Sequence, residues 1–195
     1  MTLKTALAQG VKLLSDGGVP APRLTAEVLL AHALQRERIY LIAHAADEIS
    51  DLAQLHFGRY LHERLQGKPT QYITKRQEFY GRDFRVEPGV LIPRPETELL
   101  IELALHHLQP GMRILDIGAG SGCIGITLAL EAGVQAVATD LSAAALRIAA
   151  RNNATLHGGV QLLNADLASP FAPASFDAVV SNPPYIPDHD RPSLA

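Results

Sequence analysis

Residues 114–122, ILDIGAGSG, are the stretch that decides the fold of this chain. The first four form a short apolar segment typical of a buried strand, and a glycine-rich loop follows at once. Glycine lets the backbone turn sharply and lets a ligand approach it closely. Residues 124–131 continue with helical character, so the stretch predicts a strand, a loop that can hold a ligand, and a helix in succession.

The same alternation continues along the chain. Three further strands are predicted over residues 134–139, 160–164 and 176–181, and an alanine-rich helix over 141–156. Strands alternating with helices predict a parallel, doubly wound, Rossmann-like α/β sheet in which the fourth strand pairs beside the first. The glycine loop and Asn182, which follows the fourth strand, are therefore expected to be neighbours at the carboxyl ends of the strands.

The N-terminal third of the chain predicts a bundle of helices. Apolar residues recur at helical spacing from residue 2 to about residue 66, and Gly17-Gly18 ends the first helix. Pro22 opens a second helix, a short third helix follows near residues 39–46, and Ser50 can cap a fourth. We expect that fourth helix to bury one face, formed by Leu52, Leu55, Leu61 and Leu65.

A β-hairpin is predicted between the helices and the sheet. Strand-like segments occur at Tyr72-Ile73, at Phe79-Tyr80 and over 84–86, with Gly81 at the turn. The predicted domains are therefore a helical domain over 1–68, a hairpin linker over 69–90 and a ligand-binding domain over 91–195.

Composition narrows the class of protein. The chain has 195 residues, 47% of them hydrophobic, and a net charge of -3, which fits a globular protein and not one that binds a phosphate backbone. Cys123 is the only cysteine, so no internal disulfide can form. With no long apolar run we expect a cytoplasmic protein that does not associate with membranes. Asp188-His189-Asp190 lacks an organising metal-ligand spacing, and we expect no metal.

The glycine loop fits two kinds of ligand. Gly120, Gly122 and Gly125 satisfy the dinucleotide pattern G-x-G-x-x-G, and Asp140 ends the second strand, where an acid can bind ribose hydroxyls. NAD and S-adenosyl-L-methionine both need this arrangement. Asp116, just before the first glycines, favours the methyl donor, because a carboxylate there repels a pyrophosphate and could orient loop amides or an ammonium group.

Asn182-Pro183-Pro184-Tyr185 suits the holding of a planar –NH2 group. The Asn182 side-chain oxygen and the Pro183 carbonyl can each accept one N–H of a target amide, which orients its nitrogen and favours the charge that develops on it. The two prolines stiffen the backbone, and the Tyr185 ring can stack on the target. The tetrad therefore predicts transfer of a small group to an amide or an exocyclic amine.

The tetrad and residues 116–122 together resemble the class I S-adenosylmethionine-dependent methyltransferases that act on nitrogen. That group includes enzymes that modify DNA bases and enzymes that modify glutamine. Residues 69–73 (PTQYI), 78–81 (EFYG) and 91–98 (LIPRPETE) resemble the release-factor glutamine N5-methyltransferases, which are HemK/PrmC-like. A base amino-methyltransferase acting on DNA or RNA, and a cofactor-binding module without activity, are the alternatives.

The resemblance implies a function and a set of site residues. The expected reaction is methylation of the glutamine in the Gly-Gly-Gln motif of class 1 peptide chain release factors, which the helical domain helps to hold, by a monomer that does not bind nucleic acid directly. The family's sheet normally continues for further strands, so we expect a C-terminally incomplete domain.

The implied cofactor-binding residues are Gly118, Ala119, Gly120, Ser121, Gly122, Asp140, Asp166, Leu167 and Asn182. The implied substrate-binding residues are Asn182, Pro183, Pro184 and Tyr185. Of these, Asn182, Pro183 and Tyr185 are the catalytic candidates. Leu167 replaces the aromatic residue that many members carry there.

Overall fold

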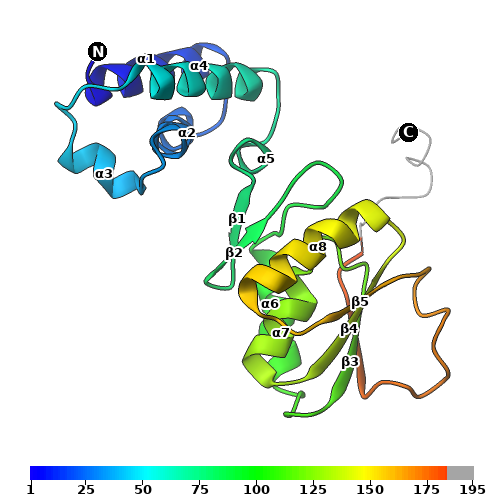
Figure 1. The fold of residues 1–195 in the computed structure, drawn as a ribbon. Helices are drawn as coiled ribbons and strands as arrows, with labels where there is room; N and C mark the ends of the chain where they lie inside the picture. The colour runs from blue at the N-terminus through cyan, green and yellow to red at the C-terminus, as the bar shows by residue number, and fades with distance from the viewer. Residues whose placement is uncertain (184–195) are drawn as a thin grey trace. The chain divides into compact units, whose positions relative to one another are not determined.

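Helices build the N-terminal unit of the computed structural model, Met1–Lys75 (Figure 1). The helix starts follow from the sequence: the side chains of Thr2 and Ser50 each accept a hydrogen bond from a first-turn N–H, and Pro22 opens its helix as predicted. The structure describes residues 1–183 of the chain. The helices of this unit are α1 (Leu3–Asp16), α2 (Pro22–Leu34), α3 (Arg38–Ala43), α4 (Asp51–Leu65) and α5 (Thr70–Thr74).

The predicted buried face of α4 is confirmed at Leu61 and wrong at the other three leucines. Leu52 is 63% exposed and Leu55 is 70% exposed, and Leu65 is exposed as well. The residues that α4 buries are Ala53, Phe57, Tyr60 and Leu61. The aromatic rings decide the face because they bury more area than a leucine. Phe57 packs where Gly10 of α1 has no side chain, since a Cβ on Gly10 would lie 2.6 Å from Phe57 Cζ.

The first predicted strand, at Tyr72-Ile73, is also wrong, because these residues lie in α5. Ile73 is buried with the helical core, so this apolar pair serves a helix packing face and not a strand. The hairpin itself forms from β1 (Arg76–Phe79) and β2 (Arg82–Arg85). Gly81 lies at its turn as predicted, and both Tyr80 and Gly81 have positive φ, as a two-residue turn that matches the strand twist requires.

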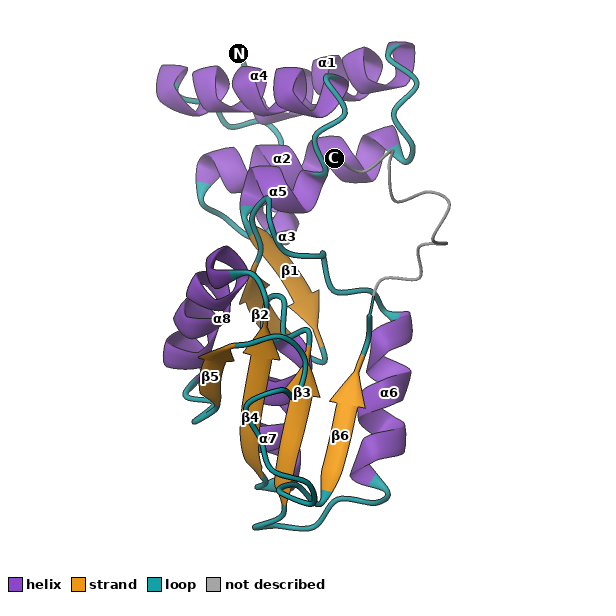
Figure 2. Cartoon of the chain, turned by 90° about the vertical axis from the view of Figure 1, so that its right-hand side faces the viewer, coloured by secondary structure: helices purple, strands orange, loops and turns teal. Residues whose placement is uncertain are grey.

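The second unit, which begins at Arg76, contains a parallel sheet in the order β5-β4-β3-β6 (Figure 2). This is the predicted order. Figure 1 shows its three helices on one side of the sheet. Ile101 of α6, Ile126 of α7 and Val180 of β6 share its hydrophobic core. The strands are β3 (Arg113–Ile117), β4 (Gln135–Asp140), β5 (Gln161–Asn164) and β6 (Ala178–Ser181), and the helices are α6 (Glu96–Leu105), α7 (Cys123–Ala132) and α8 (Ala143–Leu156).

The strand order reverses at β3, which pairs with β4 on one side and with β6 on the other. Ligands of such sheets bind beside this point, at the carboxyl ends of the strands. The glycine loop follows β3, Asp140 ends β4, and Asn182 follows β6, so all of them belong to one edge of the sheet. Within residues 1–183 no helix is long and apolar enough to cross a membrane.

Candidate active site

The glycines of the loop at 118–122 have different surroundings. Gly118, Gly120 and Gly122 all have positive φ, which disfavours other residues. A Cβ added to Gly118 would meet nothing within 4 Å, and one on Gly120 would approach only the Gly118 carbonyl, at 3.9 Å. A Cβ on Gly122 would lie 2.9 Å from Ile126 Cδ1 and 3.2 Å from Ala149 Cβ. The first two glycines therefore border open space for a ligand, whereas Gly122 is needed for helix packing.

Three successive backbone N–H groups of this loop are already paired with the end of β4. The N–H groups of Gly118 and Ala119 both donate to the Thr139 carbonyl, at 2.9 Å. The Gly120 N–H donates to Asp140 Oδ2 at 2.8 Å. A pyrophosphate needs such groups to be available, so the loop is better suited to a ligand without phosphate. This arrangement favours the methyl donor over NAD.

Asp140 is held by the backbone on both of its carboxylate oxygens. Oδ2 accepts the Gly120 N–H, and Oδ1 accepts the Ser142 N–H at 2.8 Å. Each oxygen keeps a further lone pair, so the fixed carboxylate can accept ribose hydroxyls. Asn164 supports the same strand end, because its Nδ2 donates to the carbonyls of Asp140 and Leu141 at 2.8 and 2.9 Å. The sequence reasoning missed Asn164, although an amide at the end of the neighbouring strand was a usable signal.

Asp116 is fully buried beneath the loop. Its Oδ2 accepts the Gly125 N–H at 2.9 Å, so it positions the first turn of α7. Burial raises the pKa of this carboxyl to about 7; the hydrogen bond from Gly125 opposes the rise and the nearby Asp140 adds to it. Among residues 1–183 Asp116 Oδ1 has no hydrogen-bond partner. Gly125 is required here, since a Cβ on it would lie 3.1 Å from Asp116 Oδ2.

Asn152 of α8 is a supporting residue that the sequence reasoning missed. It is buried, and its Nδ2 donates to the Ser121 carbonyl at 2.8 Å and to the Arg85 carbonyl at 3.0 Å. Its Oδ1 accepts the Arg85 N–H at 2.7 Å. The side chain thus joins the loop to β2 of the hairpin. No local pattern indicates a contact between residues so far apart in the sequence.

The predicted residues after β5 are less closely held. Asp166 and Leu167 are both exposed, and Leu167 has a positive φ. They follow a strand whose carboxyl end lies at the same sheet edge as the glycine loop. Their exposed side chains are available to a ligand, but no described hydrogen bond joins them to the loop.

Asn182 is half-buried at the end of β6. Its Nδ2 donates to Thr97 Oγ1 of α6 at 2.9 Å. The preceding residue, Ser181, donates from Oγ to the Ile117 carbonyl at 2.8 Å, which joins the ends of β6 and β3. Pro183 is exposed. Pro184 and Tyr185 of the tetrad, and the Asp188-His189-Asp190 segment, lie outside the described residues.

Two family models match this chain. The PrmC N-terminal domain matches residues 5–74, and the methyltransferase small domain matches residues 95–194. The second match spans more than half of the chain and includes the glycine loop, Asp140 and Asn182.

Curated relatives match almost the whole of this chain. A release factor glutamine methyltransferase of Koribacter versatilis is 46% identical over 95% of this chain and 68% of its own length. Another, from Moorella thermoacetica, is 42% identical over the whole of this chain and 70% of its own length. This chain thus spans roughly two thirds of these relatives.

A solved structure supports the fold of the second unit. The T. thermophilus 16S rRNA N2 G1207 methyltransferase, solved with AdoMet and guanosine, matches 57% of this chain and 32% of its own length, with a TM-score of 0.51 and 26% identity. The sheet and its glycine loop therefore define a class I methyltransferase, and the predicted methyl donor, S-adenosyl-L-methionine, is confirmed for this class. Within that class, the chain belongs to the release factor glutamine methyltransferase family.

Proposed function

We propose that this protein transfers a methyl group from S-adenosyl-L-methionine to the side-chain nitrogen of the glutamine in the Gly-Gly-Gln motif of class 1 peptide chain release factors. The observation that carries the proposal is the position of Asn182 in a chain of this family. Asn182 follows β6, and β6 pairs with β3, after which the glycine loop begins. We further propose that it acts in the cytoplasm as a monomer, without binding nucleic acid directly.

The donor fits the loop as it stands. Gly118 and Gly120 border open space, and the backbone holds the Asp140 carboxylate with acceptor capacity left for ribose hydroxyls. Asp166 and Leu167 are exposed at the same sheet edge, where they can contact the adenine ring. When bound, the donor supplies an electrophilic methyl group on a positively charged sulfur. Ala119, Ser121 and Gly122 are the further residues of the proposed cofactor-binding set, and Gly122 also allows α7 and α8 to pack closely.

The acceptor amide needs orientation and a change in its electron distribution. An amide nitrogen is a poor nucleophile because its lone pair is delocalised into the carbonyl. Asn182 Oδ1 and the Pro183 carbonyl can accept its two N–H bonds, which turns the nitrogen towards the methyl group and stabilises developing positive charge. In this proposal Pro184 stiffens the loop, and Tyr185 stacks on the planar amide.

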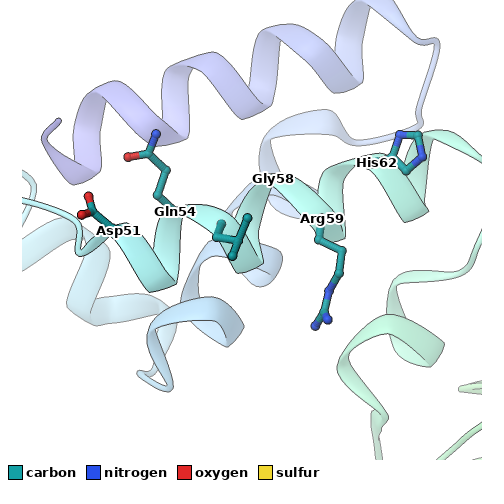
Figure 3. Close-up of a pocket in the computed structure, with 6 residues that line it drawn as sticks. Asp51, Gln54, Gly58, Arg59 and His62 are labelled. Atoms are coloured by element: carbon teal, nitrogen blue, oxygen red, sulfur yellow. The ribbon is translucent and has the colours of Figure 1, made fainter.

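The helical unit offers a surface for the protein substrate. A hollow of about 590 Å³ lies along α4 (Figure 3). Leu55 is 70% exposed in it, and Arg59 projects from the same helix. An exposed apolar side chain beside a cation is well suited to contact a protein partner. We propose that this α4 face, formed by Asp51, Gln54, Leu55, Gly58, Arg59 and His62, binds the release factor.

Methylation of purified release factor tests the reaction. The chain is incubated with labelled S-adenosyl-L-methionine and release factor, beside an active family member as the positive control. Label is expected on one glutamine, and none on a release factor whose Gly-Gly-Gln glutamine is replaced by alanine. Absence of label while the control enzyme is active refutes the activity. Greater transfer to DNA or RNA would instead support the base amino-methyltransferase, and donor binding without any transfer would support a binding module.

The α4 face is tested by Leu55→Asp. A charge in the centre of a protein interface is expected to raise the KM for release factor about tenfold, because interface anchors of this kind contribute roughly 1–2 kcal/mol. The kcat and the Kd for S-adenosylhomocysteine should stay unchanged. Leu13→Asp is the matched control, because Leu13 is an exposed leucine of the same unit on α1. Equal KM values for the two variants would exclude the α4 face as the binding surface.

A further inference from the structure

Thr97 lies in the first turn of α6 and is almost fully buried, at 6% exposure. It belongs to the PETE part of residues 91–98, for which the sequence suggested no individual role. Its Oγ1 accepts a hydrogen bond from Asn182 Nδ2 at 2.9 Å, across 85 positions of the chain. We propose that Thr97 is the positioning residue that holds the Asn182 amide in place, with its oxygen left free to face the acceptor glutamine.

The chemistry follows from the two ends of an amide. The side chain of Asn182 presents an acceptor oxygen on one branch and a donor –NH2 on the other. Because the –NH2 group is turned towards Thr97, the oxygen points to the other side of the side chain. The –NH2 group of the target amide presents N–H donors, so only the Asn182 oxygen can accept from it. Rotation of the Asn182 amide by half a turn would place donor against donor.

Rotation is otherwise weakly opposed. The terminal torsion of an asparagine has a broad, roughly two-fold profile, so an external partner must choose its orientation. Because a hydroxyl can donate as well as accept, Thr97 fixes the position of the amide, and the N–H groups of the target select the orientation in which Nδ2 faces Thr97. Thr97 itself stands on a rigid support. Ile101, one turn further along α6, is fully buried in the same core as Val180 of β6. The two elements that carry Thr97 and Asn182 are therefore held together independently of their hydrogen bond.

The inference rests on the proposed function, and substitutions of similar shape test it. Thr97→Val removes the hydroxyl and keeps the volume, whereas Thr97→Ser keeps the hydroxyl. Loss of one hydrogen bond at this position predicts about a fivefold to tenfold lower kcat for Thr97→Val, with the KM for release factor and the Kd for S-adenosylhomocysteine little changed. Thr97→Ser should restore most of the kcat.

Thr127→Val is the matched control. Thr127 is fully buried in α7, and its Oγ1 has no hydrogen-bond partner within residues 1–183. Loss of that hydroxyl should leave kcat at the wild-type value. If Thr97→Val lowers the Tm more than Thr127→Val does, the kcat of Thr97→Ala, which also lacks the hydroxyl, is compared with that of Thr97→Ser. A wild-type kcat for Thr97→Val, or a Thr97→Ser variant no more active than Thr97→Val, overturns the inference.

A measurement without turnover separates this inference from the proposed function. In the complex with S-adenosylhomocysteine, NMR of the Asn182 side-chain amide should show one proton that exchanges slowly with solvent. That protection should disappear in Thr97→Val and persist in Thr97→Ser. If the wild type methylates no release factor but shows this pattern, only the proposed function fails. If the protection is unchanged in Thr97→Val, the positioning role fails whatever the activity.

Discussion

The glycine loop and Asn182 stand at the carboxyl ends of the adjacent strands β3 and β6, yet they are held in different ways. Successive loop amides, at Gly118, Ala119 and Gly120, donate to the end of β4. Asn182 is oriented through its side chain, by the hydrogen bond to Thr97. In the proposed site, the donor side is therefore fixed by backbone geometry, and the acceptor side by the placement of individual side-chain atoms.

This contrast predicts that mutations can separate donor binding from methyl transfer. A region fixed by its backbone tolerates new side chains wherever its conformation survives. A region fixed by one amide group responds to the loss of that group. Substitutions in the loop should thus act on donor affinity and stability, whereas substitutions at the end of β6 should act on the rate of transfer.

The largest effect is expected from Asn182→Ala. The variant removes the oxygen that we propose accepts from the target amide, and the loss of one preorganised polar group of this kind lowers kcat by about 10²–10³. The Kd for S-adenosylhomocysteine should change far less, because the loop amides and Asp140 are untouched. Single-turnover methylation and calorimetry measure the two quantities. A nearly wild-type rate would refute the catalytic role of Asn182.

Burial of the Asp116 carboxyl makes the stability of the fold depend on pH. Asp116, beneath the loop, has its pKa raised from 3.8 to about 7. Between those pH values the unfolded chain carries an ionised Asp116, while the folded protein keeps it protonated. The folded state then binds more protons, so stability is expected to fall as the pH rises from about 4 to about 7. The decline attributable to Asp116 is on the order of 4 kcal/mol.

Urea unfolding of the wild type and of Asp116→Asn, followed across this pH range, checks the prediction. The variant cannot ionise at this position, so its stability should vary less with pH. The free energy of unfolding of the wild type should therefore fall relative to that of Asp116→Asn as the pH rises. Parallel pH profiles for the two proteins would show that Asp116 does not titrate in this window.

The arrangement of the sheet was predictable from the sequence. The strands at 114–117 and 135–140 are apolar runs between glycine and polar residues, and the topology of alternating strands and helices leaves few possible orders. The order β5-β4-β3-β6 follows, and with it the meeting of the glycine loop and the end of β6. Local patterns and general rules of connection sufficed for this part of the fold.

The packing of α4 and α5 was less predictable. The leucines of α4 suggested one face, but the rings of Phe57 and Tyr60 occupy the core instead. The decisive contact is with Gly10, on another helix, and a pattern within α4 does not contain it. Tyr72-Ile73 is equally apolar in a strand or in a short helix. Its assignment to α5 depends on burial of Ile73 against the helical core.

Two supporting residues of the site, Asn152 and Thr97, could not be predicted from the sequence. Asn152 contacts the loop and the hairpin through tertiary hydrogen bonds, and Thr97 meets Asn182 in the same way. Such pairs have no period and no fixed spacing. Residues that contact a ligand tend to occupy the ends of predicted strands, whereas the residues that orient them can come from any element packed nearby.

The smallest effect is expected from Asp140→Asn, which tests the backbone-fixed side of the comparison. An asparagine keeps one acceptor oxygen, so it can accept the N–H of Gly120 or of Ser142 but not both as the carboxylate does. Loss of one charge-assisted hydrogen bond predicts about a tenfold higher Kd for S-adenosylhomocysteine. The kcat at saturating donor should change little, because Asn182 is unaffected.

Asp166→Asn is the matched control for this last prediction. It makes the same substitution at another acid of the same sheet edge, where the side chain is exposed. Its amide oxygen can still accept a hydrogen bond from an adenine amino group, so the Kd should stay close to that of the wild type. Calorimetry on both variants makes the comparison. If Asp140→Asn lowers kcat and leaves the Kd unchanged, the division between a donor side fixed by backbone and an acceptor side fixed by side chains is wrong.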